Sequence, residues 1–223
     1  MVEDDDGVVL SLFRKAWQTA NTVDHQQRSD ETRRFLKDYL HLFPVVPETL
    51  AVIFEERRVW SGLQTETEDL DRSFFGGRLI KLVGDCLRCN LLVEYADLGS
   101  KECFGQTQFQ GEIGNSTSYS LRILISSLLR DSTRGQGLVA VGGIACRGVP
   151  CTRLVILHEL LHVVEYICRS HLVGESILVG HDPKADEKNE MFMTIFNYFS
   201  YLHNPYLEKT KNSYLTDFSG VDR

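Results

Sequence analysis

Residues 154–164 read Leu-Val-Ile-Leu-His-Glu-Leu-Leu-His-Val-Val, an apolar run that is interrupted by two histidines and one glutamate. The pattern predicts a buried helix from about Thr152 to Ser170, with Pro150 just ahead of its start. Two imidazoles and a carboxylate are costly to bury unless they find partners. The run therefore predicts a polar site on a core helix.

The two histidines, His158 and His162, are four residues apart, so a helix places them on one face about one turn apart. Both imidazoles can then bind one zinc ion, which needs a third protein ligand and keeps a position for water. Glu159 points roughly 100° around the helix, where it can act as general base on that water. The alternative is an amphipathic helix with two hydrogen-bonded core histidines and a solvated glutamate.

The third zinc ligand is expected downstream, and His181 is the favoured candidate because it lies just before a second predicted helix. A carboxylate ligand on that helix, Glu187 or Glu190, is the first alternative. His171, nine residues after His162, is the second. Two further side chains lie on the motif helix without an assigned ligand role, Glu165 and Tyr166.

The rest of the chain predicts helices first, then strands, then two helices. Helical spacing occurs at 8–20, 30–43 and 48–60, and a polar stretch at 61–69 leads into a short helix that ends at Phe75 before Gly76 and Gly77. Strand patterns cover 78–83, 91–95 and 119–126, a charged loop covers 130–137, and the last helices cover 152–170 and 183–202. This order predicts an α+β fold.

Beyond the motif, an ordered set of segments resembles the SprT-like zinc metallopeptidase family over about residues 65–200. The set comprises Leu70–Leu79 as "D..FFgGrL", Arg122–Leu129 as "I.lS..ll", Leu157–His162 as "lHEllH" and Gly180–Pro183 as "GHgp", with Cys86 and Cys89 where members carry small residues or cysteines. Three features depart from the pattern. The segment from Arg130 to Cys151 is long, Asp182 replaces the usual glycine, and the stretch from His162 to His181 is slightly longer than usual.

The resemblance implies a zincin-like fold, with a small sheet packed on the motif helix, and a Zn²⁺-dependent endopeptidase that acts on protein or peptide substrates. It implies a metallopeptidase domain at 61–205, which is followed by a tail at 206–223. Residues 1–60 lie outside the resemblance, and their helical spacing predicts an N-terminal helical extension. Eukaryotic relatives degrade proteins crosslinked to DNA. The alternatives are a glutamate-ligand zinc peptidase and an inactive zinc-containing adaptor.

Net charge and the absence of targeting signals bear on two expectations, DNA binding and cellular location. The 223 residues carry 31 acidic and 24 basic side chains, a net charge of −7, so the composition gives no independent support for DNA binding. The acidic N-terminus does not fit a signal peptide, and the most apolar stretch, 138–146, is too short for a membrane span. We therefore expect an intracellular protein, cytoplasmic or nuclear, that is neither secreted nor membrane-bound.

The six cysteines are expected to be thiols rather than disulfides in that compartment. Cys86 and Cys89, with Cys146 and Cys151, are also candidates for a second, structural zinc site, although the two pairs are distant in sequence. Buried thiols are the favoured interpretation.

Overall fold

The computed structural model describes residues 7–12, 15, 34, 37–43, 60–99, 104–111, 119–132, 139–141, 144–146 and 148–172. The chain divides into two compact units, one formed by Met1–Pro47 with Gly180–Arg223 and the other by Glu48–Val179. In the first unit, residues 7–12 and 37–42 are helical, as their spacing predicts. Each segment contributes buried apolar side chains, Val9 and Leu12 in the first and Tyr39 in the second, with Phe43 just after it.

The second unit is built on a three-stranded sheet with the strand order β1-β3-β2. β1 (Asn90–Ala96) runs parallel to β3 (Tyr119–Ser126), and β2 (Gly105–Gly111) runs antiparallel to it. Successive strand residues face opposite sides of a sheet, and every second residue of β3 is buried, namely Leu121, Ile123 and Ile125. The predictions at 91–95 and 119–126 are confirmed.

β2 was not predicted, because its sequence lacks the apolar alternation that marks a half-buried strand. Glutamine occupies every second position, and the described side chains of β2 are all half-buried. The strand lies at one edge of the three-stranded sheet. Its pairing with β3 places Thr107 opposite Ile123, at the centre of the core-facing row.

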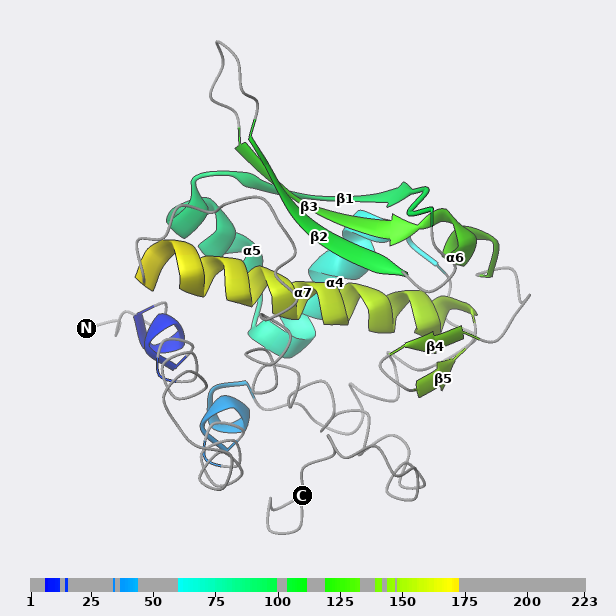
Figure 1. Ribbon diagram of the computed structural model, residues 1–223. Coiled ribbons are helices and arrows are strands. Elements are labelled where there is room, and N and C mark those ends of the chain that lie inside the picture. The colour runs from blue at the N-terminus through cyan, green and yellow to red at the C-terminus, as the bar shows by residue number, and fades with distance from the viewer. Residues whose placement is uncertain are drawn as a thin grey trace, which may run out of the picture. The chain divides into compact units, whose positions relative to one another are not determined.

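The longest described helix, α7 (Gly148–Leu172), contains the histidine motif and confirms the predicted helix at 152–170. Pro150 lies inside its first turn, where the missing N–H has no helical partner to lose. α7 contacts β2 and β3 and runs along the sheet. A second helix, α4 (Leu63–Phe75), contacts α7 and crosses it (Figure 1). The residues from Cys151 to Leu157 are all buried, so the part of α7 just before the histidine motif lies in the core.

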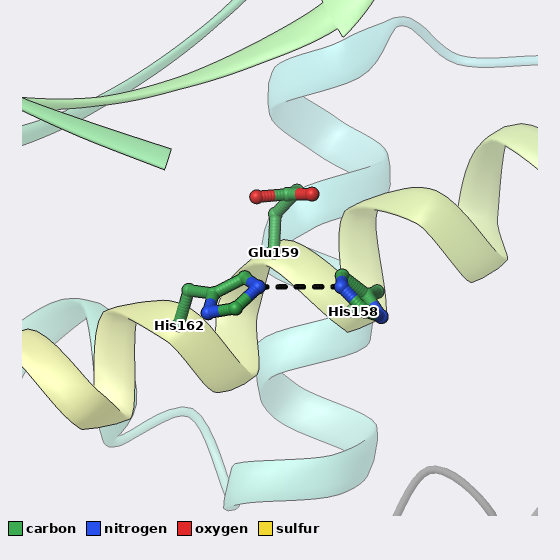
Figure 2. Close-up of side chains that lie close together, drawn as sticks. All are labelled: His158, Glu159 and His162. Carbon is green, nitrogen blue, oxygen red and sulfur yellow. Dashed lines mark hydrogen bonds between the residues drawn. The ribbon is translucent and has the colours of Figure 1, made fainter. Parts of the chain in front are cut away.

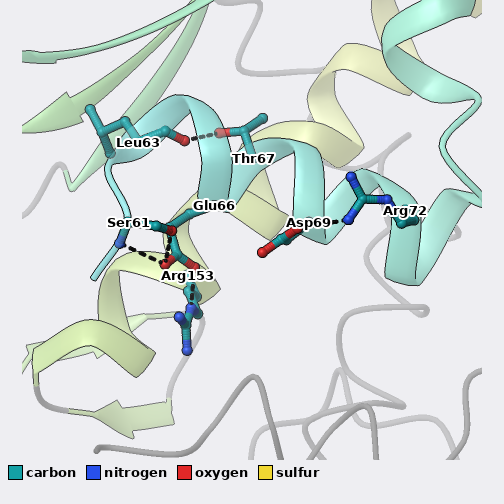
Figure 3. Close-up of polar contacts among 7 residues, drawn as sticks. All are labelled: Ser61, Leu63, Glu66, Thr67, Asp69, Arg72 and Arg153. Atoms are coloured by element: carbon teal, nitrogen blue, oxygen red, sulfur yellow. Dashed lines mark hydrogen bonds and ion pairs between the residues drawn. The ribbon is translucent and has the colours of Figure 1, made fainter. Parts of the chain in front are cut away.

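α4 begins earlier than its sequence suggests, because most of the polar stretch at 61–69 lies inside the helix. Two of its polar side chains are buried and satisfied: Glu66 pairs with Arg153 of α7, and the Thr67 hydroxyl donates to the Leu63 carbonyl at 2.7 Å (Figure 3). Burial raises the pKa of Glu66, but hydrogen bonds from Arg153 and Ser61 outweigh it and leave that pKa below its usual value. The predicted stop is confirmed, since Gly76 has a left-handed conformation with φ 64°.

The strand predicted at 78–83 is wrong, because α5 (Leu79–Leu82) and a π-helix, η1 (Val83–Leu87), occupy this region. The carboxylate of Asp71 accepts hydrogen bonds from the backbone N–H groups of Leu79 (3.0 Å) and Ile80 (3.2 Å). It thereby satisfies two donors that a helix start leaves open. A capping side chain eight residues upstream is invisible to a local pattern.

The end of α6 (Ser127–Ser132) overlaps the loop predicted at 130–137, whose residues 133–137 lie outside those described. Two short strands follow it, β4 (Val139–Val141) and β5 (Ile144–Cys146), which are paired antiparallel. The described residues of the second unit are thus a mixed sheet with helices before and after it, which confirms the α+β class. The helices predicted at 48–60 and 183–202 lie outside the described residues, apart from residue 60.

Two further expectations concern membranes and cysteines. Within the described part of the chain, no helix combines the length and apolar character that crossing a bilayer requires. Cys86, Cys89 and Cys151 are thiols, as expected. Burial raises the pKa of the Cys89 thiol, which keeps that thiol protonated near neutral pH.

Candidate metal centre

The two histidines of the motif converge on one face of α7. The Nε2 atoms of His158 and His162 lie 3.2 Å apart, and the rings meet edge to face with centroids separated by 5.0 Å (Figure 2). Both side chains are half-buried. The helical spacing therefore brings the two nitrogen donors together as the sequence predicts.

The separation of the two nitrogens fits a shared tetrahedral zinc ion. Zinc–imidazole bonds of about 2.0–2.1 Å at a tetrahedral angle place the two nitrogens about 3.3 Å apart. The observed 3.2 Å matches this value without rearrangement of the helix. The pair can equally share one hydrogen bond when no metal is bound, because a neutral imidazole has one donor and one acceptor.

The protonation state of His158 also suits metal binding. The pKa of His158 is lowered to about 4, mainly by burial and in smaller part by the nearby His162. Desolvation disfavours the imidazolium ion, and a like charge at the neighbouring ring disfavours it again. His158 is therefore neutral at pH 7, which is the form that binds a metal.

Glu159 lies beside this pair and is directed toward the sheet rather than toward solvent (Figure 2). Its exposed fraction is 4%, so the alternative of a solvated glutamate is wrong. One ligand atom from each of His158, Glu159 and His162 lies within 4.8 Å of the other two. The carboxylate is thus close enough to exchange a proton with a molecule that binds between the histidines.

Two residues of β2 complete the surroundings of Glu159, and sequence reasoning missed both. The Thr107 hydroxyl lies 2.7 Å from Glu159 Oε2, to which it donates. A Cβ atom added at Gly105 would lie 2.5 Å from Glu159 Oε1, so only glycine fits against the carboxylate. The available signal was that Gly105, Thr107 and Phe109 share one face if 105–111 is a strand.

Tyr166 extends the same stripe of α7, four residues beyond His162. Its hydroxyl donates to the Thr107 carbonyl at 3.5 Å, a long hydrogen bond. The tyrosine ring is half-buried. Tyr166 and Glu159 therefore both reach β2, one at the backbone and one at the side chain of the same residue.

The third-ligand candidates cannot be placed next to this pair. His181, Glu187 and Glu190 lie outside the described residues, and for His171 and Glu165 the structure describes the backbone in α7 but not the side chain. His181 therefore stays a prediction.

The cysteines do not form a second metal site within the described residues. There, His158, Glu159 and His162 are the one group of three potential metal ligands. Cys86 is half-buried in η1, and Cys89 and Cys151 are buried. The side chain of Cys146 is not described. A structural zinc site at these cysteines therefore stays a prediction.

Comparison with known proteins identifies no relative. No family model matches the chain, and neither the curated proteins nor the solved structures give a significant match. The resemblance to SprT-like peptidases therefore remains a prediction from the ordered sequence segments.

Proposed function

We propose that the chain is a zinc-dependent endopeptidase of SprT-like type. The observation that carries this proposal is the 3.2 Å separation of the His158 and His162 Nε2 atoms, with a buried carboxylate beside them. Many proteins bury histidines, but two imidazoles and a buried acid together on one helix are typical of a site with a chemical use. The sequence motif and this geometry support the same reaction class.

In this proposal His158 and His162 hold the zinc ion, and His181 is the expected third ligand. Zinc, when bound, supplies a Lewis acid that polarises a peptide carbonyl and lowers the pKa of water. The histidines contribute by being fixed on a buried helix with their nitrogens 3.2 Å apart, so these nitrogens need little reorganisation to bind the ion.

Glu159 supplies the proton transfers. Its carboxylate accepts a proton from the attacking water as the water oxygen bonds to the peptide carbonyl carbon. It then delivers that proton to the amide nitrogen, so that the carbon–nitrogen bond breaks and a neutral amine leaves. Burial beside β2 limits competition from bulk water for this carboxylate.

The position of β2 favours an extended polypeptide as the substrate. The Ser126 N–H donates to the Phe104 carbonyl at 2.9 Å, and paired residues of an antiparallel ladder alternate between bonded and non-bonded pairs. Phe104 and Ser126 are thus a bonded pair, and Thr107, three residues after Phe104, forms a non-bonded pair with Ile123. The backbone groups of Thr107 therefore point away from β3, toward the outer edge of the sheet. An extended chain can add to such an edge, which would bring its carbonyl groups alongside Glu159.

The proposal is tested with the full chain loaded with one equivalent of zinc and mixed with casein or histone, with and without single-stranded DNA. We expect cleavage that stops on chelation and returns when zinc is restored. Cleavage that needs DNA supports a role on DNA-associated proteins. Stoichiometric zinc binding without cleavage under any of these conditions overturns the peptidase proposal and supports the adaptor.

A further inference from the structure

One side chain of β2, that of Thr107, contacts the motif helix at two oxygen atoms of Glu159. The Thr107 hydroxyl oxygen lies 2.7 Å from Glu159 Oε2 and 3.2 Å from the Glu159 backbone carbonyl oxygen. These residues are 52 positions apart in sequence, and their side chains belong to different elements. The sheet therefore reaches the candidate general base directly, not through intervening side chains.

The hydroxyl has one hydrogen to donate, and two oxygens compete for it. The carboxylate oxygen is closer by 0.5 Å (3.2 Å against 2.7 Å) and carries charge. Hydrogen bonds to a charged acceptor are shorter and roughly twice as strong as those between neutral groups. The carboxylate is thus the preferred acceptor, and the helix carbonyl is a secondary one.

The other carboxylate oxygen occupies space that Gly105, two residues earlier on the same face of β2, leaves open. A Cβ atom at this position would lie 2.5 Å from Oε1 and 2.6 Å from Val155 Cγ1. The missing side chain therefore leaves open the space in which Oε1 lies, while Oε2 lies at the Thr107 hydroxyl. A carboxylate rotated out of this orientation would lose its hydrogen bond to the hydroxyl.

We propose that Thr107 is a positioning residue for the hydrolysis, because its hydroxyl fixes the Glu159 carboxylate in the orientation needed to accept the water proton. The catalytic meaning of this inference rests on the proposed peptidase function. The contact itself does not, and the two can be tested separately. The competing interpretation is that the hydroxyl merely fastens β2 to the backbone of α7.

The first experiment measures the contact in the zinc-free protein by a double-mutant cycle of urea unfolding. Thr107→Val keeps the shape and the strand preference but removes the hydroxyl. We expect it to raise the unfolding constant about tenfold when Glu159 is present, and much less in a Glu159→Ala background. Equal effects in both backgrounds overturn the proposal, since the hydroxyl would then act on the backbone.

Thr67→Val is the matched control, because its hydroxyl also makes a buried 2.7 Å hydrogen bond, but to a backbone carbonyl in α4. Its effect on unfolding should be the same with and without Glu159. If Glu159→Ala does not fold, Glu159→Leu, which is closer in volume, replaces it in the cycle.

The second experiment measures casein cleavage by the zinc-loaded full chain. We expect Thr107→Val to lower kcat by about 10- to 100-fold with KM within about twofold, and to leave the zinc content unchanged. Thr107→Ser, which restores the hydroxyl without the methyl group, should recover most of kcat. A merely structural role predicts no such recovery.

Unchanged kcat in Thr107→Val overturns the positioning role, and so does a Thr107→Ser variant as impaired as Thr107→Val. A wild-type chain that binds zinc but cleaves nothing overturns the proposed function instead. In that case the unfolding cycle alone decides whether Thr107 holds the carboxylate.

Discussion

Arg153 and Glu66 form a buried ion pair between α7 and α4, with Arg153 Nε 2.5 Å from Glu66 Oε2 (Figure 3). Each side chain has an exposed fraction of 1%. Ser61 donates to the other carboxylate oxygen from its hydroxyl at 2.8 Å and from its backbone at 3.3 Å. This network joins the start of α4 to α7 five residues before His158.

Removing one partner of this pair should destabilise the protein strongly. Glu66→Gln leaves a buried guanidinium without its counter-charge, and such changes cost about 3–5 kcal/mol. Urea unfolding measures the loss. The control is Arg72→Met, which breaks the exposed pair with Asp69 and should change stability by less than about 1 kcal/mol. Similar small effects from both variants would contradict the buried-pair interpretation.

Gly105→Ala should disturb the site by steric overlap. The added methyl group meets both Glu159 and Val155, and overpacking of this kind costs about 1–3 kcal/mol. Gly84→Ala is the matched control, since nothing lies within 4 Å of a Cβ atom there. Thermal unfolding and zinc-dependent cleavage measure both variants. Wild-type behaviour of Gly105→Ala would show that β2 does not lie this close to Glu159.

The zinc-free protein should lose stability in acid because of His158. Its folded pKa, about 4, is below the unfolded value near 6.5, so the unfolded state binds the proton more readily. The stabilising effect is complete above pH 6.5 and is lost as the pH falls toward 4, by at most about 1.4 kcal/mol per pH unit. Unfolding between pH 4 and 7 measures this slope, which should flatten in His158→Ala. An identical slope in both proteins contradicts a buried neutral histidine.

His181→Ala should remove the third zinc ligand that the sequence predicts. Two remaining imidazoles bind zinc less tightly than three ligands do, so we expect most of the bound metal to be lost on dialysis. Atomic absorption measures the zinc content. Full retention would exclude His181, and the same assay on Glu187→Gln and Glu190→Gln would then test the carboxylate alternatives.

The elements that could be predicted are those whose determinants are local. The motif helix, β3 and the glycine stop of α4 each follow from residues within a few positions, such as Gly76 after Phe75. α5 could not be predicted, because its start depends on the Asp71 carboxylate eight residues upstream. β2 could not either, because its partners are β3 and α7 rather than its own neighbours.

The residues of the candidate site also fall into a group that local sequence predicts and a group that it does not. His158, Glu159 and His162 follow from helical spacing, and the structure brings them within 4.8 Å. Thr107 and Gly105 approach Glu159 only through tertiary packing across about fifty residues of sequence. A pattern search along one element cannot find groups that another element supplies.

The most direct test of the central claim compares Glu159→Gln with the wild-type chain for zinc content and casein cleavage in the same preparation. Glu68→Gln, an exposed glutamate on α4, is the matched control. We expect one zinc per chain in all three proteins, and cleavage lowered at least about a hundredfold in Glu159→Gln alone. Full cleavage by Glu159→Gln would show that Glu159 is not the general base.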